Sequence, residues 1–539
     1  MDRLPWELFQ DILLVFAHNA TKNDVLTKRL VCRDFNHILR PLGCRTISLE
    51  LTRLSKLYNV PKPRSDGLQT IGHRCKALHI DMTVLRDDDE VEVLNSELQH
   101  LPSMQGFCHA LRHRYSFSDA GFTELDFYQT TAEVLFYCRD IDRVRICLPQ
   151  SIRGSHCGVA TRVLANAFKA LGQRPEEDSA PLKTLVIDNI PEVTLCELWI
   201  NPSDVMNMQA LLPSVETLAL STRCFDRVSF SAIMFGVALW NMISSTRNLQ
   251  SLYLACSGAS RTVKDDNLPE EVTHQDMDFT QWLERRLSGP GPQVTLPKPT
   301  YLELRHVAML PEELLHIAAA FGPSLEELHL FDVSLMIEQS LTSNAESDMH
   351  LWVGLPNVDA GPRQWMAMRF RALMPNLRIC RCSNLNYKSY LHTTGPVQRV
   401  FDYADPARIG RSIAQRFVEV VTGLQQPSLP DGTPMRFHPH DDEFDHLLHN
   451  LTERRSRIPI AEYDFEAHRL AAADRPPDYQ HSLDGLFANC VDGSRREIRG
   501  IVDKVVEGLM AIERLDLESL HLGNTGPGQG LPDPAAGST

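Results

Sequence analysis

The segment Gly322-Pro-Ser-Leu-Glu-Glu-Leu-His-Leu330 decides how the chain folds, because its pattern returns along the sequence. An apolar residue is followed by two variable residues, a second apolar residue, one variable residue and a third apolar residue. The same pattern is clear in segments that begin at Leu182, Val215 and Leu249. Apolar residues at alternate positions indicate a short strand with one face in a core. Weaker copies begin at Cys44, Cys75, Met104, Ile141, Pro299 and Leu377.

The distance in sequence between successive copies suits a strand followed by a helix. Successive copies begin 31, 29, 37, 41, 33, 34, 50, 26 and 52 residues apart. These spacings are too long for a β-hairpin, and most of them suit a strand, a crossover helix and a return to a parallel strand. Apolar residues at helical spacing lie between the copies, for example from Val159 to Leu171 and from Leu314 to Phe321. The sequence therefore predicts an α/β repeat over residues 44–390.

Other parts of the chain depart from this repeat. Residues 257–298 form an acidic insertion bounded by Gly and Pro, and residues 339–361 form a second, polar insertion. Beyond them, residues 391–522 are predicted to be mainly helical, with amphipathic helices near 413–424 and 498–509 and a last copy of the repeat pattern at Ile512. The Gly/Pro-rich tail, residues 523–539, is predicted to be disordered.

Composition excludes several classes of protein. The chain has 539 residues, with 69 acidic against 54 basic side chains and a net charge of -15, which disfavours nucleic acid as a partner. No apolar run near the start approaches the ~18 residues that a membrane span needs, so no membrane partner is expected. The 13 cysteines are scattered without CxxC pairs, as in reduced proteins. We therefore expect a soluble protein of the cytoplasm, the nucleus or both.

The first forty residues are predicted to form two or three short helices. Pro5 suits the first position of a helix, and Leu8, Ile12, Val15 and Phe16 then fall on one face. A second helix follows a polar break, and Pro41 ends the helical pattern. So short a segment cannot build a self-sufficient core, so it must pack on the rest of the chain or on another protein.

Three blocks in this segment resemble an F-box. They are Leu4-Pro-Trp-Glu-Leu8, then Asp11-Ile-Leu13, then Lys28-Arg-Leu-Val-Cys-Arg-Asp-Phe-Asn36. They are similar to that family's LPxEL, I-L pair and LVCRxFN blocks, in the same order, within residues 1–43. The continuation Leu39–Leu49 resembles the junction with the repeats in fungal members of the family. One departure is a longer polar segment around His18 to Lys22.

The resemblance implies a docking module. An F-box binds a Skp-type adaptor, which links it to a cullin-based ubiquitin ligase, so the chain would be the non-catalytic subunit that recognises a protein substrate. The matching positions imply an adaptor-binding set that consists of Leu4, Pro5, Glu7, Leu8, Ile12, Leu13, Leu30, Val31 and Cys32. An apolar helical patch left open on a soluble chain fits such an interface.

The repeated strand and helix resemble an irregular leucine-rich-repeat solenoid. Regular leucine-rich repeats place an Asn after the strand, but here Ile190, Arg223 and Val333 occupy that offset. An ordinary α/β domain with a doubly wound sheet is the alternative, although no Gly-rich phosphate turn follows any of the strands.

The solenoid interpretation also predicts a site for the protein substrate. The variable positions between the apolar residues would line the open face of the sheet. Aromatic and arginine side chains at these positions suit binding hot spots. The predicted substrate-binding set is Tyr253, Tyr301, Glu303, Arg305, His329, Phe331 and Arg381.

Signs of catalysis or metal binding are few. One cluster could supply zinc ligands, and it consists of His438, His440, Asp441, Asp442, Asp445, His446 and His449. In it, His446 and His449 would share a helix face, but HExxH is absent and Pro439 and the acidic run favour a solvated loop. Cys380 and Cys382 are expected to be buried thiols. GxSxG, GxxxxGK[ST] and GxGxxG motifs are absent, so no catalytic residue, metal or other cofactor is predicted.

Two other hypotheses stay open at this stage. The chain could be a repeat scaffold without a ligase link, in which case Leu8, Ile12 and Leu30 would be buried against the first repeats. Exposure of the same residues on a protruding group of helices would favour the ligase subunit. The remaining hypothesis is a hydrolase or metal enzyme centred on the His/Asp cluster.

Overall fold

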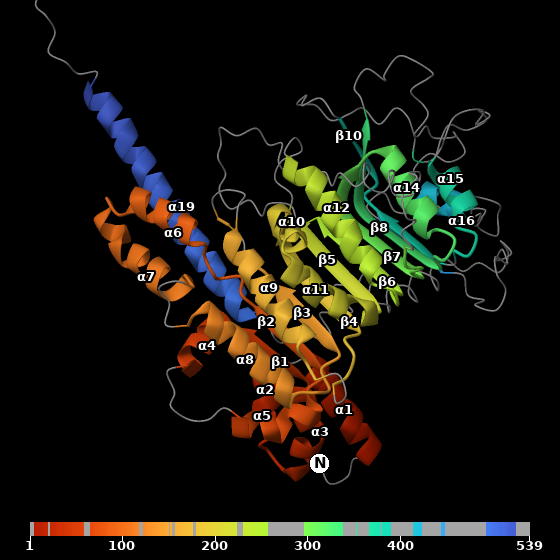
Figure 1. The fold of residues 1–539 in the computed structure, drawn as a ribbon, viewed down its shortest axis with the longest axis horizontal. Coiled ribbons are helices and arrows are strands. Elements are labelled where there is room, and N and C mark those ends of the chain that lie inside the picture. The colour runs from red at the N-terminus through yellow and green to blue at the C-terminus, as the bar shows by residue number, and fades with distance from the viewer. Residues whose placement is uncertain are drawn as a thin grey trace, which may run out of the picture.

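The computed structural model describes most of the repeat region and both flanking helical parts. The described residues are 5–19, 22–58, 65–117, 122–149, 151–152, 157–175, 179–223, 230–256, 296–337, 352, 366–377, 379–389, 413–422, 443–447 and 492–523. They form one sheet with helices packed along it, and a group of helices at the N-terminal end of the sheet (Figure 1).

Nine parallel strands follow one another across the sheet in chain order. Their apolar positions are in register, because Leu218 of one strand pairs with Leu185 and Leu252 of its neighbours. The strands are β1 (Thr46–Glu50), β2 (Ala77–Asp81), β3 (Arg143–Cys147), β4 (Thr184–Pro191), β5 (Thr217–Arg223), β6 (Ser251–Cys256), β7 (Tyr301–Met309), β8 (Glu327–Ile337) and β9 (Ile379–Ser383). Each arises from one copy of the repeat pattern, so the predicted α/β architecture with its parallel sheet is confirmed.

Helices alternate with the strands and pack on their neighbours in the array. Contacts join α8 to α9, α9 to α11, α10 to α12, and α14 through α15 to α16. In chain order the helices are α1 (Trp6–Asn19), α2 (Lys22–Lys28), α3 (Arg33–Gly43), α4 (Leu51–Tyr58), α5 (Ser65–Ile71), α6 (Asp88–Leu98), α7 (Gln105–Tyr115), α8 (Glu124–Tyr137), α9 (Gly158–Gly172), α10 (Glu192–Ile200), α11 (Pro202–Leu211), α12 (Phe230–Ser245), α14 (Pro311–Phe321), α15 (Met366–Leu373), α16 (Ile413–Thr422) and α19 (Asp492–Gly523).

The main core lies between the helices and one face of the sheet. The apolar residues of the repeat pattern join the same buried cluster as helix residues such as Phe168, Trp240 and Phe321. The rings of Trp240 and Phe321 stack with centroids 5.8 Å apart. A separate small cluster, with Ala219 at its centre, lies on the opposite face of the sheet. Right-handed crossovers between sequential strands place their helices on one face, unlike a doubly wound sheet, in which the strand order reverses.

Two predicted copies of the repeat pattern are helical instead of extended. Met104 ends a short 3-10 helix (Pro102–Met104) and leads into α7, and Ile512 lies within α19. In α7 the buried residues Cys108, Leu111 and Tyr115 recur at helical spacing, which outweighs the short alternating pattern.

Two strands extend the sheet beyond the nine. Strand β10 (Asn386–Ser389) pairs in parallel with β8, and β11 (Glu443–Leu447) pairs antiparallel with β9. The predicted helix that would carry His446 is therefore wrong, since Asp445 and His446 belong to β11. The edge of β9 offers unpaired backbone groups, and such an edge can override a local helical pattern.

The C-terminal helix returns to the first part of the array. As predicted, the segment around 498–509 is helical, and the buried side chains of Ile501 and Val505 face the core. Helix α19 contacts α6, and Tyr115 Oη donates a hydrogen bond to a Glu497 carboxylate oxygen at 2.8 Å (Figure 1). Within the described part of the chain, no helix is long and apolar enough to cross a membrane.

Four of the nine strands share a backbone feature that the sequence pattern does not reveal. Among the described residues, the non-glycine residues with positive φ are Asn189 at 63°, His306 at 53°, Asp332 at 54° and Asn384 at 50°. Each lies two residues after the last apolar position of its copy, one position before the offset at which an Asn is expected. Asn, Asp and His tolerate this left-handed conformation better than most residues. The copies that form β4, β7, β8 and β9 therefore share this backbone conformation although their sequences differ at the position.

Candidate functional site

Helices α1, α2 and α3 hold together around a small core of their own. The ring of Phe9 on α1 meets the ring of Phe35 on α3 edge-on, with centroids 5.5 Å apart. Helix α3 contacts both α1 and α2. The buried members of this core are Leu13, Ala17, Val25, Ile38 and Leu39.

The outer face of these helices exposes large apolar side chains. Leu8 and Ile12 on α1 are 52% and 54% exposed, and Leu30 and Val31, between α2 and α3, are 76% and 63% exposed. Covering such a side chain is worth about 1.5–3 kcal/mol, so a surface of this kind favours a partner. We call Leu8, Ile12, Val15, Leu30 and Val31 the N-terminal apolar surface.

Most of the predicted adaptor-binding residues are accessible. Pro5, Glu7 and Cys32 are exposed alongside this surface, whereas Leu4 lies outside the described residues. Leu13 differs from the prediction, because it is only 5% exposed and packs in the core of the three helices. The helical period turns Leu13 about 100° away from Ile12 and toward the side of Phe9 and Ala17.

Two further exposed apolar residues of α1 were not in the predicted set. Trp6 is 46% exposed and Val15 is 62% exposed. Val15 lies three residues after Ile12 and seven after Leu8, so the helical spacing contains the signal that would have found it. Trp6 lies two residues before Leu8, so the helical period turns it about 160° away from Leu8, and the centroid of its ring lies 5.7 Å from that of Phe9.

The seven predicted substrate-binding residues share one face of the sheet. Tyr253, Glu303, His329 and Arg381 are successive register partners across β6, β7, β8 and β9. Tyr301, Arg305 and Phe331 lie two residues before or after members of this row, so strand alternation puts them on the same face. The structure therefore brings all seven together.

That face is less open than expected. Glu303, His329, Phe331 and Arg381 are buried, while Tyr253, Tyr301 and Arg305 are half-buried. Neighbouring strands are close enough for long side chains to cover one another. The ring of Tyr301 lies 4.7 Å from that of Tyr253 and 4.6 Å from that of His329, and the Arg305 guanidinium lies 4.7 Å over the Phe331 ring. Only the half-buried members offer contact area to a second protein.

A buried carboxylate organises this cluster. Glu303 accepts a hydrogen bond from Tyr301 Oη at 2.7 Å and one from Arg305 Nε at 3.2 Å. Burial, followed by the nearby Glu303 carboxylate, raises the pKa of Tyr301 well above its ordinary value. Tyr301 is therefore a neutral hydrogen-bond donor at any physiological pH.

A second polar cluster lies on the same sheet face, over β2, β3 and β4. Arg145 Nε pairs with Asp188 Oδ2 at 2.6 Å, and the Cys147 sulfur lies 3.4 Å from His79 Nε2. A cysteine beside a histidine resembles a nucleophile and its base. Burial, followed by the charge of Asp188, instead raises the pKa of Cys147 well above its ordinary value. The thiol stays protonated, so this cluster is structural.

Cysteine labelling should distinguish these environments. At pH 8, iodoacetamide is expected to modify exposed Cys32 and to leave Cys147 and Cys157 unmodified in the folded chain, since burial raises the pKa of Cys157 to about 12. Peptide mass mapping gives the extent of labelling at each position, and labelling in denaturant is the control. Modification of Cys147 at the rate of Cys32 would contradict the structural role of its cluster.

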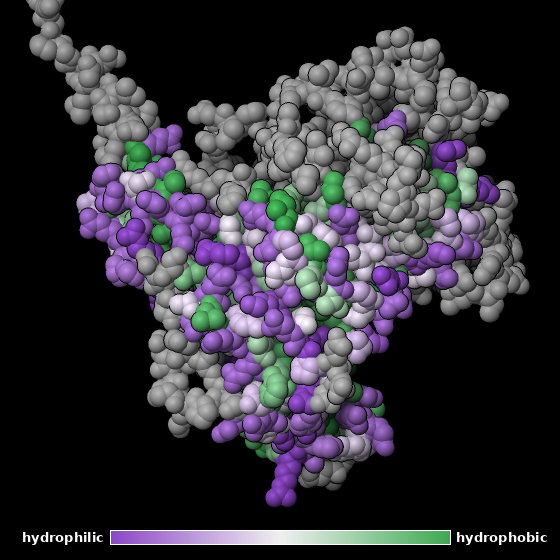
Figure 2. All heavy atoms as spheres, viewed as in Figure 1, coloured by the Kyte–Doolittle hydropathy of each residue, from purple (hydrophilic) through white to green (hydrophobic). Residues whose placement is uncertain are grey.

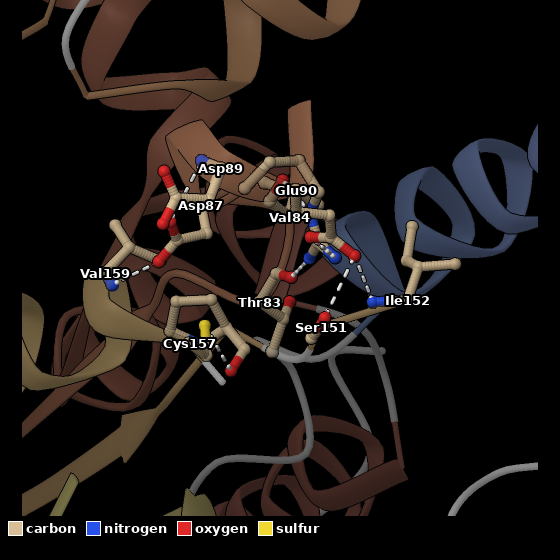
Figure 3. Close-up of polar contacts among 11 residues, drawn as sticks. Thr83, Val84, Asp87, Asp89, Glu90, Ser151, Ile152, Cys157 and Val159 are labelled. Atoms are coloured by element: carbon tan, nitrogen blue, oxygen red, sulfur yellow. Dashed lines mark hydrogen bonds and ion pairs between the residues drawn. The ribbon is translucent and has the colours of Figure 1, made fainter. Parts of the chain in front are cut away.

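A third polar cluster joins the loops that follow β2 and β3 (Figure 3). Arg86 is fully buried, and one of its terminal nitrogens lies 3.6 Å from a Glu90 carboxylate oxygen. Glu90 also accepts hydrogen bonds from the Ser151 hydroxyl at 3.2 Å and from the backbone N–H of Ile152. Asp87 accepts from the backbone N–H of Val159, at the start of α9, at 2.9 Å. These contacts join the unit of β2 and α6 to the unit of β3 and α9.

The predicted metal-like cluster receives little support. His438, His440, Asp441, Asp442 and His449 lie outside the described residues, and Asp445 and His446 lie in β11. In the described ranges, no group of three or more His, Cys, Asp or Glu side chains is placed to hold a metal ion. Cys380 and Cys382 are buried in the main core, as predicted.

Figure 2 shows hydrophobic residues among hydrophilic ones over the face of the molecule in view. Isolated exposed apolar residues are common and need no partner. The sequence matches no model of a known protein family. It also matches no curated protein sequence.

Proposed function

We propose that the chain is the substrate-recognition subunit of a Skp–cullin–F-box ubiquitin ligase. In this proposal helices α1 to α3 are an F-box that binds a Skp-type adaptor. The array of strands and helices is an irregular leucine-rich-repeat solenoid that binds a target protein. The chain itself catalyses no reaction.

The N-terminal apolar surface carries this proposal. Leu8 and Ile12 on α1 and Leu30 between α2 and α3 are more than half exposed, while other residues form the core of the three helices. A scaffold without a ligase link would instead bury these three residues against the first repeats. The three sequence blocks that resemble an F-box contain the same three residues.

The solenoid assignment has two supports. The strands follow one another in chain order with parallel neighbours, as expected when each repeat contacts only the next. The left-handed residues Asn189, His306, Asp332 and Asn384 recur at one position of the repeat. They also bond across repeats, since His306 Nδ1 lies 2.8 Å from Asp332 Oδ2 and Asn384 Nδ2 donates to Asp332 Oδ1 at 2.6 Å.

The chain would act by holding a target protein close to activated ubiquitin. With the adaptor on α1 to α3 and a target on the array, a lysine of the target experiences a high effective concentration of activated ubiquitin. Tyr253, Tyr301 and Arg305 are the half-buried residues of the sheet face that are best placed for target contact, because aromatic and arginine side chains dominate binding hot spots.

Affinity purification of the full chain followed by mass spectrometry tests the proposal. A Skp-type adaptor and a cullin are expected in amounts comparable to the chain, together with less abundant candidate targets. Recovery of partner proteins without adaptor or cullin would contradict the ligase assignment and would favour a repeat scaffold.

A further inference from the structure

The most exposed part of the N-terminal apolar surface is bordered by basic residues. Leu30 and Val31 have neighbours Lys28 and Arg29 on one side and Arg33 on the other. From Lys28 to Arg45 the chain has five basic residues and one acidic residue, although its net charge is -15. We call Lys28, Arg29 and Arg33 the basic corner. Its charge is opposite in sign to that of the chain as a whole.

These basic side chains are not used within the described part of the chain. Lys28 and Arg33 are exposed and Arg29 is half-buried. No ion pair joins any of the three to another described residue, whereas Lys76 and Lys183 pair with Asp140 and Glu216. Basic groups without internal partners remain available to a second molecule.

The basic residues lie close to the first half of α1. The edge-on contact between Phe9 and Phe35 places the first half of α1 against the start of α3, and Arg33 begins α3. Leu8 adjoins Phe9 in the chain, and Val31 and Cys32 directly precede Arg33. Exposed apolar residues of α1 and of the segment before α3 thus lie on neighbouring elements, with the basic residues next to Leu30 and Val31 in the chain.

We propose that the partner of this surface presents an apolar groove edged by carboxylates, and that Lys28, Arg29 and Arg33 select it. This inference rests on the proposed function, since the partner in question is the Skp-type adaptor. The apolar residues supply most of the affinity, while the basic corner speeds encounter and fixes orientation. The attraction is screened by salt, because the Debye length shortens from about 10 Å at 0.1 M to about 3 Å at 1 M.

Charge reversal provides the test. The full chain and its Lys28→Glu/Arg33→Glu variant are titrated with purified Skp-type adaptor at 50 mM and 500 mM NaCl. At 50 mM the variant is expected to bind about tenfold more weakly, mainly through slower association, and the difference should shrink at 500 mM. The matched control, Arg247→Glu/Arg499→Glu, makes the same change of charge at exposed positions on the loop before β6 and on α19, and it should bind as the wild type does.

Each outcome is informative. The inference would be overturned if wild-type binding did not change with salt and Lys28→Glu/Arg33→Glu bound as tightly as the control. That result would leave the proposed function intact. If the adaptor does not bind the wild type at either salt concentration, both fail. Light scattering tests whether a second copy of the acidic chain binds this surface instead. Dimers of the wild type that are absent in Lys28→Glu/Arg33→Glu would show that it does, and that result would overturn the adaptor assignment.

Discussion

Replacing Leu8 and Ile12 together with aspartate should lower affinity for the adaptor by about a thousandfold or more. Both side chains are more than half exposed, so they lose little on mutation in the free chain but would be covered in the complex. Each aspartate would have to lose water without a compensating partner, which costs about 2 kcal/mol or more, and about 4 kcal/mol corresponds to a thousandfold change. Titration with purified adaptor measures the loss.

The same substitutions should leave folding almost unchanged. Exposed positions usually alter the free energy of unfolding by about 0.5 kcal/mol or less. Leu125→Asp/Ile200→Asp is the matched control, because these residues are 61% and 70% exposed on α8 and α10. The control should bind the adaptor normally. Wild-type affinity in the Leu8→Asp/Ile12→Asp variant would contradict the assignment of α1 to the interface.

Local periodicity was enough to predict the strands. Leu185 and Ile187, like Leu328 and Leu330, alternate with polar or smaller residues, and all four are fully buried on the helix-covered face. The spacing between copies was too long for β-hairpins and favoured parallel pairing through a crossover helix. This is why nine strands could be placed from sequence, including those with weak copies of the pattern.

Contacts between distant segments could not be predicted in the same way. Helical spacing separates Leu13 from Ile12 by about 100°, but it did not show which of the two faces the core of the N-terminal helices, because both are apolar. It also could not show that Glu303 would be buried under Tyr301, since this depends on side chains from adjoining strands. Strand β11 owes its conformation to the edge of β9, which lies about sixty residues earlier in the chain.

The acidic run at Asp87–Glu90 is another place where contacts between distant segments could not be predicted from the sequence. As a sequence it is typical of an exposed acidic turn, and runs of like charge are usually solvated. In the structure Asp87 caps α6 by accepting from the backbone N–H of Asp89, and Glu90 is buried beside Arg86. Only the fold reveals the second strand–helix unit that supplies Ser151 and Val159 as donors.

Glu90→Ala should therefore lower the free energy of unfolding by about 3–5 kcal/mol. Arg86 is 0% exposed, and burial is the main cause that lowers its pKa, opposed first by the charge of Glu90. Removing the carboxylate leaves the guanidinium charge buried without its counter-ion and removes the acceptor of the Ser151 and Ile152 hydrogen bonds. Urea denaturation followed by tryptophan fluorescence measures the change.

A double replacement separates the ion pair from simple loss of packing. Arg86→Met/Glu90→Leu removes both charges and keeps most of the volume, so it should cost less than Glu90→Ala alone, as expected when an unpaired buried charge causes most of the damage. Glu90→Gln keeps an acceptor for Ser151 and should fall between the wild type and Glu90→Ala. A loss below about 1 kcal/mol for Glu90→Ala would mean that water reaches Arg86, because a solvated guanidinium does not require the carboxylate. Adaptor binding should be unchanged in any of these variants that remains folded, since the Arg86 cluster lies between strand–helix units and the proposed adaptor surface lies on α1 to α3.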